Sequence, residues 1–171
     1  MTNVYLTRLD SPIGRLELTA DDDAVTGLSI ERDGALPHDG EPEQSNAVLD
    51  EARRQLTEYF AGERRDFDLP LRPAGAPFQL RVWEQLLTVP YGETASYGEI
   101  AAELGAPTAS RAVGAANGRN PIAIVVPCHR VIGALVRLPV APEQRLALAH
   151  TSAARPASRS SSARFWSSPP A

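Results

Sequence analysis

The chain's only cysteine, Cys128, is followed directly by His129 and Arg130. A thiol attacks as its thiolate, and at a reference pKa of about 8.5 only a few per cent of it is ionised at pH 7. An adjacent base or a positive environment raises that fraction, so this triplet is a candidate nucleophile. Neighbouring side chains of an extended segment point to opposite faces, so His129 needs a bend at Pro127 or a bridging water to reach the sulfur. A buried structural cysteine beside an unrelated histidine fits the same residues, and both interpretations stay open here.

The elements just upstream must position this cysteine. Residues 122–126 form a short apolar run, which predicts a buried strand or extended segment leading to it. Apolar residues at helical spacing predict a helix over 78–87. Ser96 and Glu99 have the spacing of a capping box, and they predict a second helix that ends near Leu104.

A third helix is predicted after a break in the chain at residues 105–107, Gly-Ala-Pro. Thr108 is its expected N-cap, and the helix runs from Ala109 to about Asn117, rich in small residues. The second and third predicted helices, joined by a three-residue turn, have the arrangement of a helix-turn-helix. A plain helical hairpin is the alternative.

The residue pattern of the N-terminal part predicts strands followed by one helix. Alternating residues indicate strands over 4–7 and 16–19, and a third strand is expected over 24–30. After a polar loop over 33–45, a helix capped by Ser45 or Asn46 ends at Ala61-Gly62. Its expected apolar stripe consists of Val48, Ala52, Leu56, Tyr59 and Phe60. The Pro- and Gly-containing segment 72–77 is typical of a linker and predicts a domain boundary near residue 75.

Composition excludes several classes of protein. Hydrophobic residues make up 43% of the 171 residues, which favours a globular protein. No apolar run approaches the roughly 20 residues of a membrane span, and the N-terminus lacks the pattern of a signal peptide. One cysteine and three scattered histidines supply neither a disulfide nor a Cys-rich zinc site. We therefore expect a cytoplasmic protein without a membrane segment or a metal, and we expect it to be a monomer. Its net charge of −4 still allows a local basic face to bind DNA.

Several linked motifs resemble those of the O6-alkylguanine-DNA alkyltransferases. Asn120-Pro121, five further residues and then Pro127-Cys128-His129-Arg130-Val131-Ile132-Gly133 resemble the active-site segment of that family. The upstream motifs match it in order and spacing: Phe78…Val82-Trp83, Val89-Pro90-Tyr91-Gly92, Ser96-Tyr97-Gly98-Glu99-Ile100-Ala101 and Arg111-Ala112-Val113-Gly114. The resemblance is close from Phe78 to about Gly133. It is looser upstream, where Asp10-Ser11-Pro12-Ile13-Gly14 and Tyr59-Phe60-Ala61-Gly62 still fit.

The resemblance implies an α+β fold in three parts. Residues 1–75 would form a ribonuclease-H-like domain with a small β-sheet and a helix. Residues 76–137 would form a mainly helical winged helix-turn-helix domain with the DNA-binding surface and the active site. Residues 138–171 lie beyond the resemblance, and their composition predicts an irregular, disordered tail.

The implied activity is DNA repair by irreversible transfer of an alkyl group from O6-alkylguanine, and also O4-alkylthymine, to Cys128. His129 would deprotonate the thiol through a water, and Asn120 would order the turn that carries it. No metal or organic cofactor is required. Without the family match, Asn120 would be a turn-initiating residue before proline.

The implied partner is double-stranded DNA carrying alkylated bases. Tyr97 would approach the flipped guanine, and Arg111 would fill the gap that the base leaves in the duplex. The other implied substrate and DNA contacts are Ala109, Ala112, Gly114, Arg130 and Val131. Small residues on this helix would let it approach the minor groove closely. From the residues alone, Arg111 would be a solvated helix residue and Tyr97 a half-buried aromatic.

After about Ala134 the sequence departs from the family pattern. The family continues with a Gly-rich loop and a helix whose acidic residue holds the histidine, whereas here Glu143 is the only carboxylate side chain after Cys128. The tail is rich in Ala, Arg, Pro and Ser, and every basic residue of the chain is Arg, as expected of a GC-rich gene. We hypothesise a reading-frame shift near residue 134; resequencing codons 130–171 tests it, and an uninterrupted frame would exclude it.

Two other functions remain as alternatives. The first is an alkyltransferase-like protein that binds damaged DNA without transfer chemistry, which the altered tail favours and the retained Cys128 does not. The second is a Cys-His hydrolase, for which the sequence offers neither an oxyanion hole nor an orienting third group.

Overall fold

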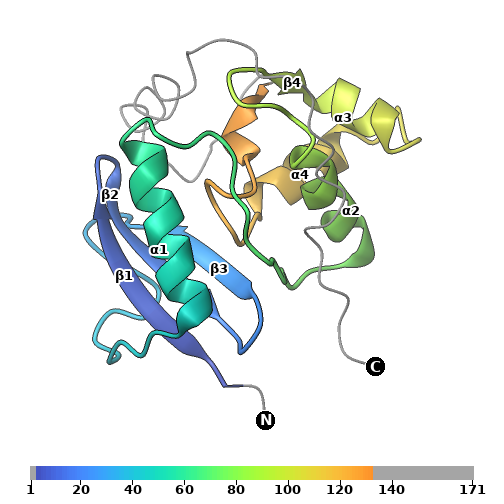
Figure 1. Cartoon of the computed structure of the whole chain (residues 1–171). Coiled ribbons are helices and arrows are strands. Elements are labelled where there is room, and N and C mark those ends of the chain that lie inside the picture. Colours follow the sequence, from blue (N-terminus) through green and yellow to red (C-terminus); the bar gives the residue numbers. More distant parts are fainter. Residues whose placement is uncertain (1–2, 133–171) are drawn as a thin grey trace. The chain divides into compact units, whose positions relative to one another are not determined.

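The computed structural model describes residues 3–132, which divide into two units between Pro73 and Ala74 (Figure 1). This division lies within the predicted linker over 72–77. The end of the predicted second domain, from residue 133, and the whole predicted tail over 138–171 lie outside the described residues.

The first unit is built on a three-stranded antiparallel sheet in the order β1-β2-β3. Its strands are β1 (Tyr5–Ser11), β2 (Gly14–Ala20) and β3 (Val25–Ile30), so the three predicted strands are confirmed. Gly14 has φ 114, a backbone conformation that suits glycine, at the start of β2 where the chain reverses from β1.

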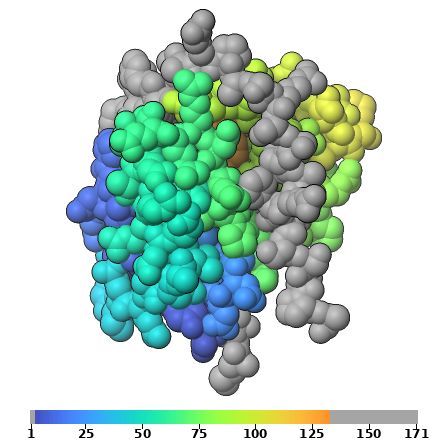
Figure 2. Space-filling model, in the orientation of Figure 1, coloured from blue at the N-terminus to red at the C-terminus, as the bar shows by residue number. Residues whose placement is uncertain are grey.

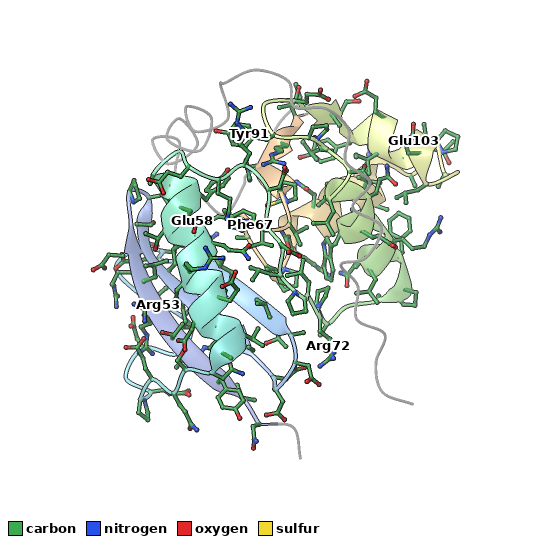
Figure 3. All side chains as sticks on the ribbon, in the orientation of Figure 1. Arg53, Glu58, Phe67, Arg72, Tyr91 and Glu103 are labelled. Atoms are coloured by element: carbon green, nitrogen blue, oxygen red, sulfur yellow. The ribbon has the colours of Figure 1, made fainter. Side chains whose placement is uncertain are left out.

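Helix α1 (Ala47–Phe60) covers one face of this sheet (Figure 1). Asn46 is its N-cap and accepts a hydrogen bond from Leu49 N at 3.0 Å. The buried stripe differs from the predicted one: Leu49 and Gln55 are buried, whereas Val48 and Phe60 are only half-buried. The outer side of α1 forms part of the molecular surface (Figure 2). On α1, Arg53 donates to Thr7 Oγ1 of β1 at 3.2 Å (Figure 3).

Charged residues lie on the opposite face of the sheet. Glu17 is only 2% exposed, and its carboxylate is bonded to Arg8 Nε at 3.3 Å and to His38 Nδ1 at 2.6 Å. Pairing Arg8 with Glu17 across β1 and β2 places both on one face. His38 is therefore part of the first unit's own structure.

The second unit begins with helix α2 (Pro77–Leu86), which has proline at its first position. It buries Val82, Trp83 and Leu86, and the Trp83 indole donates to Ala116 O at 2.8 Å. Gly75 lies against the Trp83 ring so closely that a Cβ there would be 2.5 Å from Trp83 Cη2. The predicted helix over 78–87 is confirmed.

Helices α3 (Tyr97–Glu103) and α4 (Ser110–Gly118) pack against each other and against α2. The predicted capping box is present: Ser96 Oγ accepts from Glu99 N at 3.1 Å, and Glu99 Oε2 accepts from Ser96 N at 2.7 Å. These are the two helices of the predicted helix-turn-helix, but residues 104–109 connect them, a longer link than the three residues expected.

The predicted N-cap of the third helix, Thr108, is wrong. Ala109 occupies the cap position and makes no side-chain capping hydrogen bond. The reason is local: Ala109 N donates to Ala106 O at 2.9 Å, which closes a turn and delays the helix by one residue. Thr108 is exposed.

The apolar run over 122–126 is neither a strand nor an extended segment; it forms buried turns. A short 3-10 helix (Cys128–Arg130) follows, and then β5 (Val131–Ile132). β5 pairs in parallel with β4 (Ala95–Ser96), which directly precedes α3. This pairing holds the cysteine-bearing segment next to the start of α3.

Within residues 3–132, no helix has the length and apolar character needed to cross a membrane.

Candidate active site

Asn120 closes the turn that leads to Cys128. Its Oδ1 accepts from Ile122 N at 3.0 Å, and its Nδ2 donates to Val126 O at 2.7 Å. Both backbone groups belong to fully buried residues, where an unpaired polar group costs about 1–3 kcal/mol. Together with the backbone bond from Val126 N to Ile122 O at 3.0 Å, this side chain holds both ends of a buried turn, so the apolar run bends instead of extending.

Ile124 sits at the tip of this turn in a strained conformation. Its φ is 70, in the left-handed region that β-branched residues avoid at a cost of roughly 1–2 kcal/mol. Val125 N donates to Ala123 O at 2.8 Å across it, which makes this an uncommon γ-turn. Because Ile124 is only 2% exposed, burial of its side chain offsets the strain.

The Cys128 thiol is buried at the start of the 3-10 helix, with 3% of the residue exposed. Pro127, with φ −83 and ψ 64, provides a bend, and Cys128 N donates across it to Val126 O at 2.8 Å. Burial raises the pKa of the thiol, while the Asn120 side chain and the backbone N–H groups of Cys128 and His129 act to lower it. The thiol is therefore protonated at neutral pH, with donors in place to stabilise the thiolate.

The His129 ring is a neutral base in this structure. Its Nε2 is inaccessible to solvent and has no hydrogen-bond partner among residues 3–132, although the residue as a whole is only half-buried. Burial, with a smaller contribution from the positive charge of Arg130, lowers the pKa of His129 to about 3. The ring thus has a lone pair available on a nitrogen at any physiological pH.

Arg130 lies inside the second unit. It is 7% exposed, its Nη1 donates to Val89 O at 2.9 Å, and its guanidinium lies 5.5 Å from the centre of the Tyr91 ring. The guanidinium thus holds the 89–91 turn against the 3-10 helix, and the predicted contact of Arg130 with DNA or substrate stays a prediction. Val131 is buried in β5, in keeping with an apolar wall.

Tyr97 and Gly114 come together although they lie on different helices. A Cβ at Gly114 would be 3.8 Å from both Cδ1 and Cε1 of the Tyr97 ring, so the ring covers this glycine. Tyr97 is half-buried at the start of α3, next to the β4–β5 pair that leads back to Cys128. The predicted substrate tyrosine and the predicted DNA-binding helix are therefore neighbours.

Helix α4 has one buried and one open side. Val113, Ala116 and Asn117 are buried, whereas Arg111 and Ala112 are exposed. Ala109 and Gly114 are half-buried. The open side therefore combines small residues with a single arginine, so the helix backbone can come close to a partner.

Sequence reasoning missed one residue that contacts the nucleophile. Asn117 on α4 donates from Nδ2 to the Cys128 carbonyl oxygen at 3.3 Å and is fully buried. The signal was present, because Asn117 follows Val113 and Ala116 at helical spacing and is thus a polar residue on the apolar side of the helix. In the part of the chain that the structure covers, no group of His, Cys, Asp and Glu side chains is arranged to hold a metal ion.

Both halves of the chain match family models. Residues 4–73 match the ribonuclease-like domain of 6-O-methylguanine DNA methyltransferase, and residues 77–150 match its DNA binding domain. The chain is 51% identical over 138 residues to the methylated-DNA–protein-cysteine methyltransferase of Mycobacterium leprae, covering 77% of this chain and 79% of the relative. It is 46% identical over 135 residues to the constitutive enzyme of that name from Bacillus subtilis, covering 75% and 81%.

Solved structures give the same likeness. The crystal structure of Mycobacterium tuberculosis O6-methylguanine methyltransferase superposes with a TM-score of 0.80 at 44% identity, covering 92% of this chain and 97% of that one. The Mycobacterium tuberculosis OGT structure in complex with DNA gives a TM-score of 0.73 at 46% identity, covering 85% and 91%.

Proposed function

This chain belongs to the 6-O-methylguanine DNA methyltransferase family, and we propose that it repairs DNA by moving the alkyl group of O6-alkylguanine to the Cys128 sulfur. The observation that supports this most directly is the environment of the thiol. Burial raises the pKa of the Cys128 thiol, and the Asn120 amide and the backbone N–H groups of Cys128 and His129 oppose this by stabilising the thiolate, while the neutral imidazole of His129 follows directly in the chain. Such a site supplies a base and anion stabilisation, as a thiol nucleophile requires.

The reaction is a single displacement. His129 takes the thiol proton through a water, and the Cys128 sulfur then attacks the alkyl carbon and forms a C–S bond. The bond between that carbon and O6 breaks, and its electron pair stays with the guanine, which takes a proton from a donor such as the Tyr97 hydroxyl. The thioether has no leaving group that water can displace readily, so each molecule reacts once. O4-alkylthymine would react in the same way.

DNA would be bound through the open side of α4. The O6 atom lies inside the base stack, so the nucleotide must be flipped out at a cost of a few kcal/mol. Ala109, Ala112 and Gly114 would let α4 enter the minor groove, and Arg111 would occupy the space of the extruded base. Residues 74–132 carry four arginines and four glutamates (Arg81, Arg111, Arg119, Arg130; Glu84, Glu93, Glu99, Glu103). Recognition by this part of the chain would therefore depend on the fit of α4 more than on general positive charge.

Intact mass tests the transfer step. The protein is incubated with duplex DNA that contains one O6-methylguanine and is then weighed, in parallel with Cys128→Ala. We expect a gain of one methylene group on the wild type and none on the variant. Binding without a gain in mass would indicate the alkyltransferase-like damage binder instead, and a gain that persists in Cys128→Ala would refute Cys128 as the acceptor.

A matched pair of variants tests the α4 assignment. Arg111→Ala and Arg119→Ala each remove one exposed arginine, so both lose a similar non-specific attraction to phosphates. Only Arg111→Ala should slow transfer strongly on duplex DNA while leaving transfer from the free O6-benzylguanine base unchanged. Equal effects of the two variants on duplex DNA would contradict the role given to Arg111.

A further inference from the structure

Asn117 connects the proposed DNA-binding helix to the proposed alkyl acceptor. Its side chain leaves the last turn of α4 on the buried side, and its Nδ2 donates to the Cys128 carbonyl oxygen at 3.3 Å. The preceding residue of α4 is held as well, since Ala116 O accepts from the Trp83 indole at 2.8 Å. The end of α4 is therefore anchored to α2 on one side and to the nucleophile's backbone on the other.

Stability alone does not favour an amide at this position. Asn117 is 0% exposed, and its Oδ1 has no hydrogen-bond partner among residues 3–132. A buried amide oxygen without a partner costs free energy that an aliphatic side chain of similar volume avoids. A leucine side chain removes this unpaired oxygen, and the Cys128 carbonyl keeps its hydrogen bond from Val131 N, so the variant should be as stable as the wild type or more stable.

The group that Asn117 holds is close to the reacting atom. The Cys128 carbonyl belongs to the same residue as the sulfur, and Cys128 N is itself bonded to Val126 O at 2.8 Å. Asn120 fixes the acceptor of that bond through its 2.7 Å contact with Val126 O. The Cys128 carbonyl oxygen also accepts from Val131 N at the end of the 3-10 helix, and Asn117 is the contact that connects this carbonyl to α4.

We propose that Asn117 is a positioning residue for alkyl transfer, which aligns the Cys128 sulfur with the base by fixing the Cys128 carbonyl to α4. This inference rests on the proposed function. In the proposed mechanism the base is flipped out next to α4. A Cys128 residue that is hydrogen-bonded to α4 therefore keeps its sulfur at a fixed distance from the alkyl carbon. Loss of the hydrogen bond should slow the chemical step and leave DNA affinity intact, since Asn117 is buried away from the open side of the helix.

Single-turnover kinetics on the full chain test this inference. The variants are Asn117→Leu, which removes the amide, and Asn117→Asp, which keeps its shape without the N–H donor. Val113→Ala is the matched control, because it trims another fully buried side chain of α4 that makes no contact in the proposed mechanism. Transfer rate constants are measured at saturating protein with O6-methylguanine duplex, DNA affinity is measured in a Cys128→Ala background, and stability is measured by thermal unfolding.

We expect Asn117→Leu to retain or raise the melting temperature and to bind DNA normally, but to transfer the methyl group roughly three- to tenfold more slowly, the equivalent of one hydrogen bond of about 1 kcal/mol. Asn117→Asp should be slow as well, and it provides the test if Asn117→Leu does not fold. Val113→Ala should lower the melting temperature and transfer at the wild-type rate. Wild-type rates in both Asn117 variants, or a rate loss explained by weaker DNA binding, would overturn the proposal; a wild type that transfers nothing would instead refute the proposed function.

Discussion

The side chain of Asn120 donates to Val126 O at 2.7 Å and accepts from Ile122 N at 3.0 Å, so one residue spans the whole turn that ends beside Cys128. The same amide faces the Cys128 sulfur and favours its ionised form. The group that shapes the turn therefore also lies beside the proposed nucleophile.

Replacing Asn120 with alanine should affect both properties. It leaves Ile122 N buried without a partner and removes one of the two donors to Val126 O, so the free energy of unfolding should fall by about 1–3 kcal/mol, and methyl transfer at neutral pH should slow because the thiolate loses a donor. Asn46→Ala is the control, since removal of the α1 cap costs about 1 kcal/mol in the first unit without touching the thiol. Urea unfolding and single-turnover assays on both variants check this; an Asn120→Ala protein that reacts at the wild-type rate would contradict it.

Acid should destabilise the protein through His129. The pKa of this histidine falls from 6.5 to about 3 on folding because of burial, so the folded state stays neutral while the unfolded chain takes up a proton. The neutral ring's contribution to stability is complete above pH 6.5 and is lost as the pH falls from there towards 3. Wild type should therefore lose more stability between pH 7.5 and 4.5 than His129→Gln does. Urea unfolding of both proteins at both pH values measures this loss, and His38 is present in both. Equal losses of stability in the two proteins would show that His129 is not buried in its neutral form.

Gly75 is required by its contact with Trp83. In Gly75→Ala the new methyl group would lie 2.5 Å from the indole, so the ring or the linker must move, at a cost of typically 1–3 kcal/mol. Gly118→Ala should have the opposite sign, because nothing lies within 4 Å of its added Cβ and alanine favours the helix by up to ~1 kcal/mol. Thermal unfolding of the two variants makes the comparison, and a Gly75→Ala protein as stable as wild type would mean that the ring has free space beside it.

The strain at Ile124 can be measured against its neighbour Ile122. Both isoleucines are buried, with 2% and 0% exposed, but only Ile124 has a positive φ. Substitution by glycine removes the same side chain at either position. At position 124 it also relieves the strain of the left-handed backbone conformation. Ile124→Gly should therefore be less destabilising than Ile122→Gly by roughly 1–2 kcal/mol, as measured by urea unfolding. Equal losses would indicate that the turn imposes no strain.

Periodic patterns predicted the regular elements well. The three strands, the helices and the Ser96–Glu99 capping box could be found because each rests on side chains close in sequence. Thr108 failed as a cap because a backbone turn at Ala106–Ala109 comes first, which no side-chain pattern reveals. The prediction for the run over 122–126 failed for another reason. Its apolar composition suits any buried segment, and the bend is held by the Asn120 amide together with the bond from Val126 N to Ile122 O.

Some features of the candidate site could be predicted from the sequence, and others could not. The motif around Cys128, His129 and Asn120 could be identified from order and spacing, and their roles stay predictions until they are tested. Arg130 bonds to Val89, which lies 41 residues earlier in the chain, and its predicted part in DNA or substrate binding also stays a prediction. The contact between Asn117 and Cys128 likewise depends on packing between α4 and the 3-10 helix. Such contacts are set by tertiary structure and could not be read from local spacing.

The buried, protonated state of Cys128 has a consequence for a protein that is used only once. Any reaction with a stray electrophile consumes the molecule as completely as a repair event does, so selectivity matters more than speed in the resting state. Because burial raises the pKa of the thiol, iodoacetamide should label the native protein far more slowly than the urea-unfolded chain, as mass spectrometry would record. Equal labelling would mean that the thiol is open in solution. Burial of Cys128 would therefore protect the thiol from side reactions in a protein that, in the proposed mechanism, reacts only once.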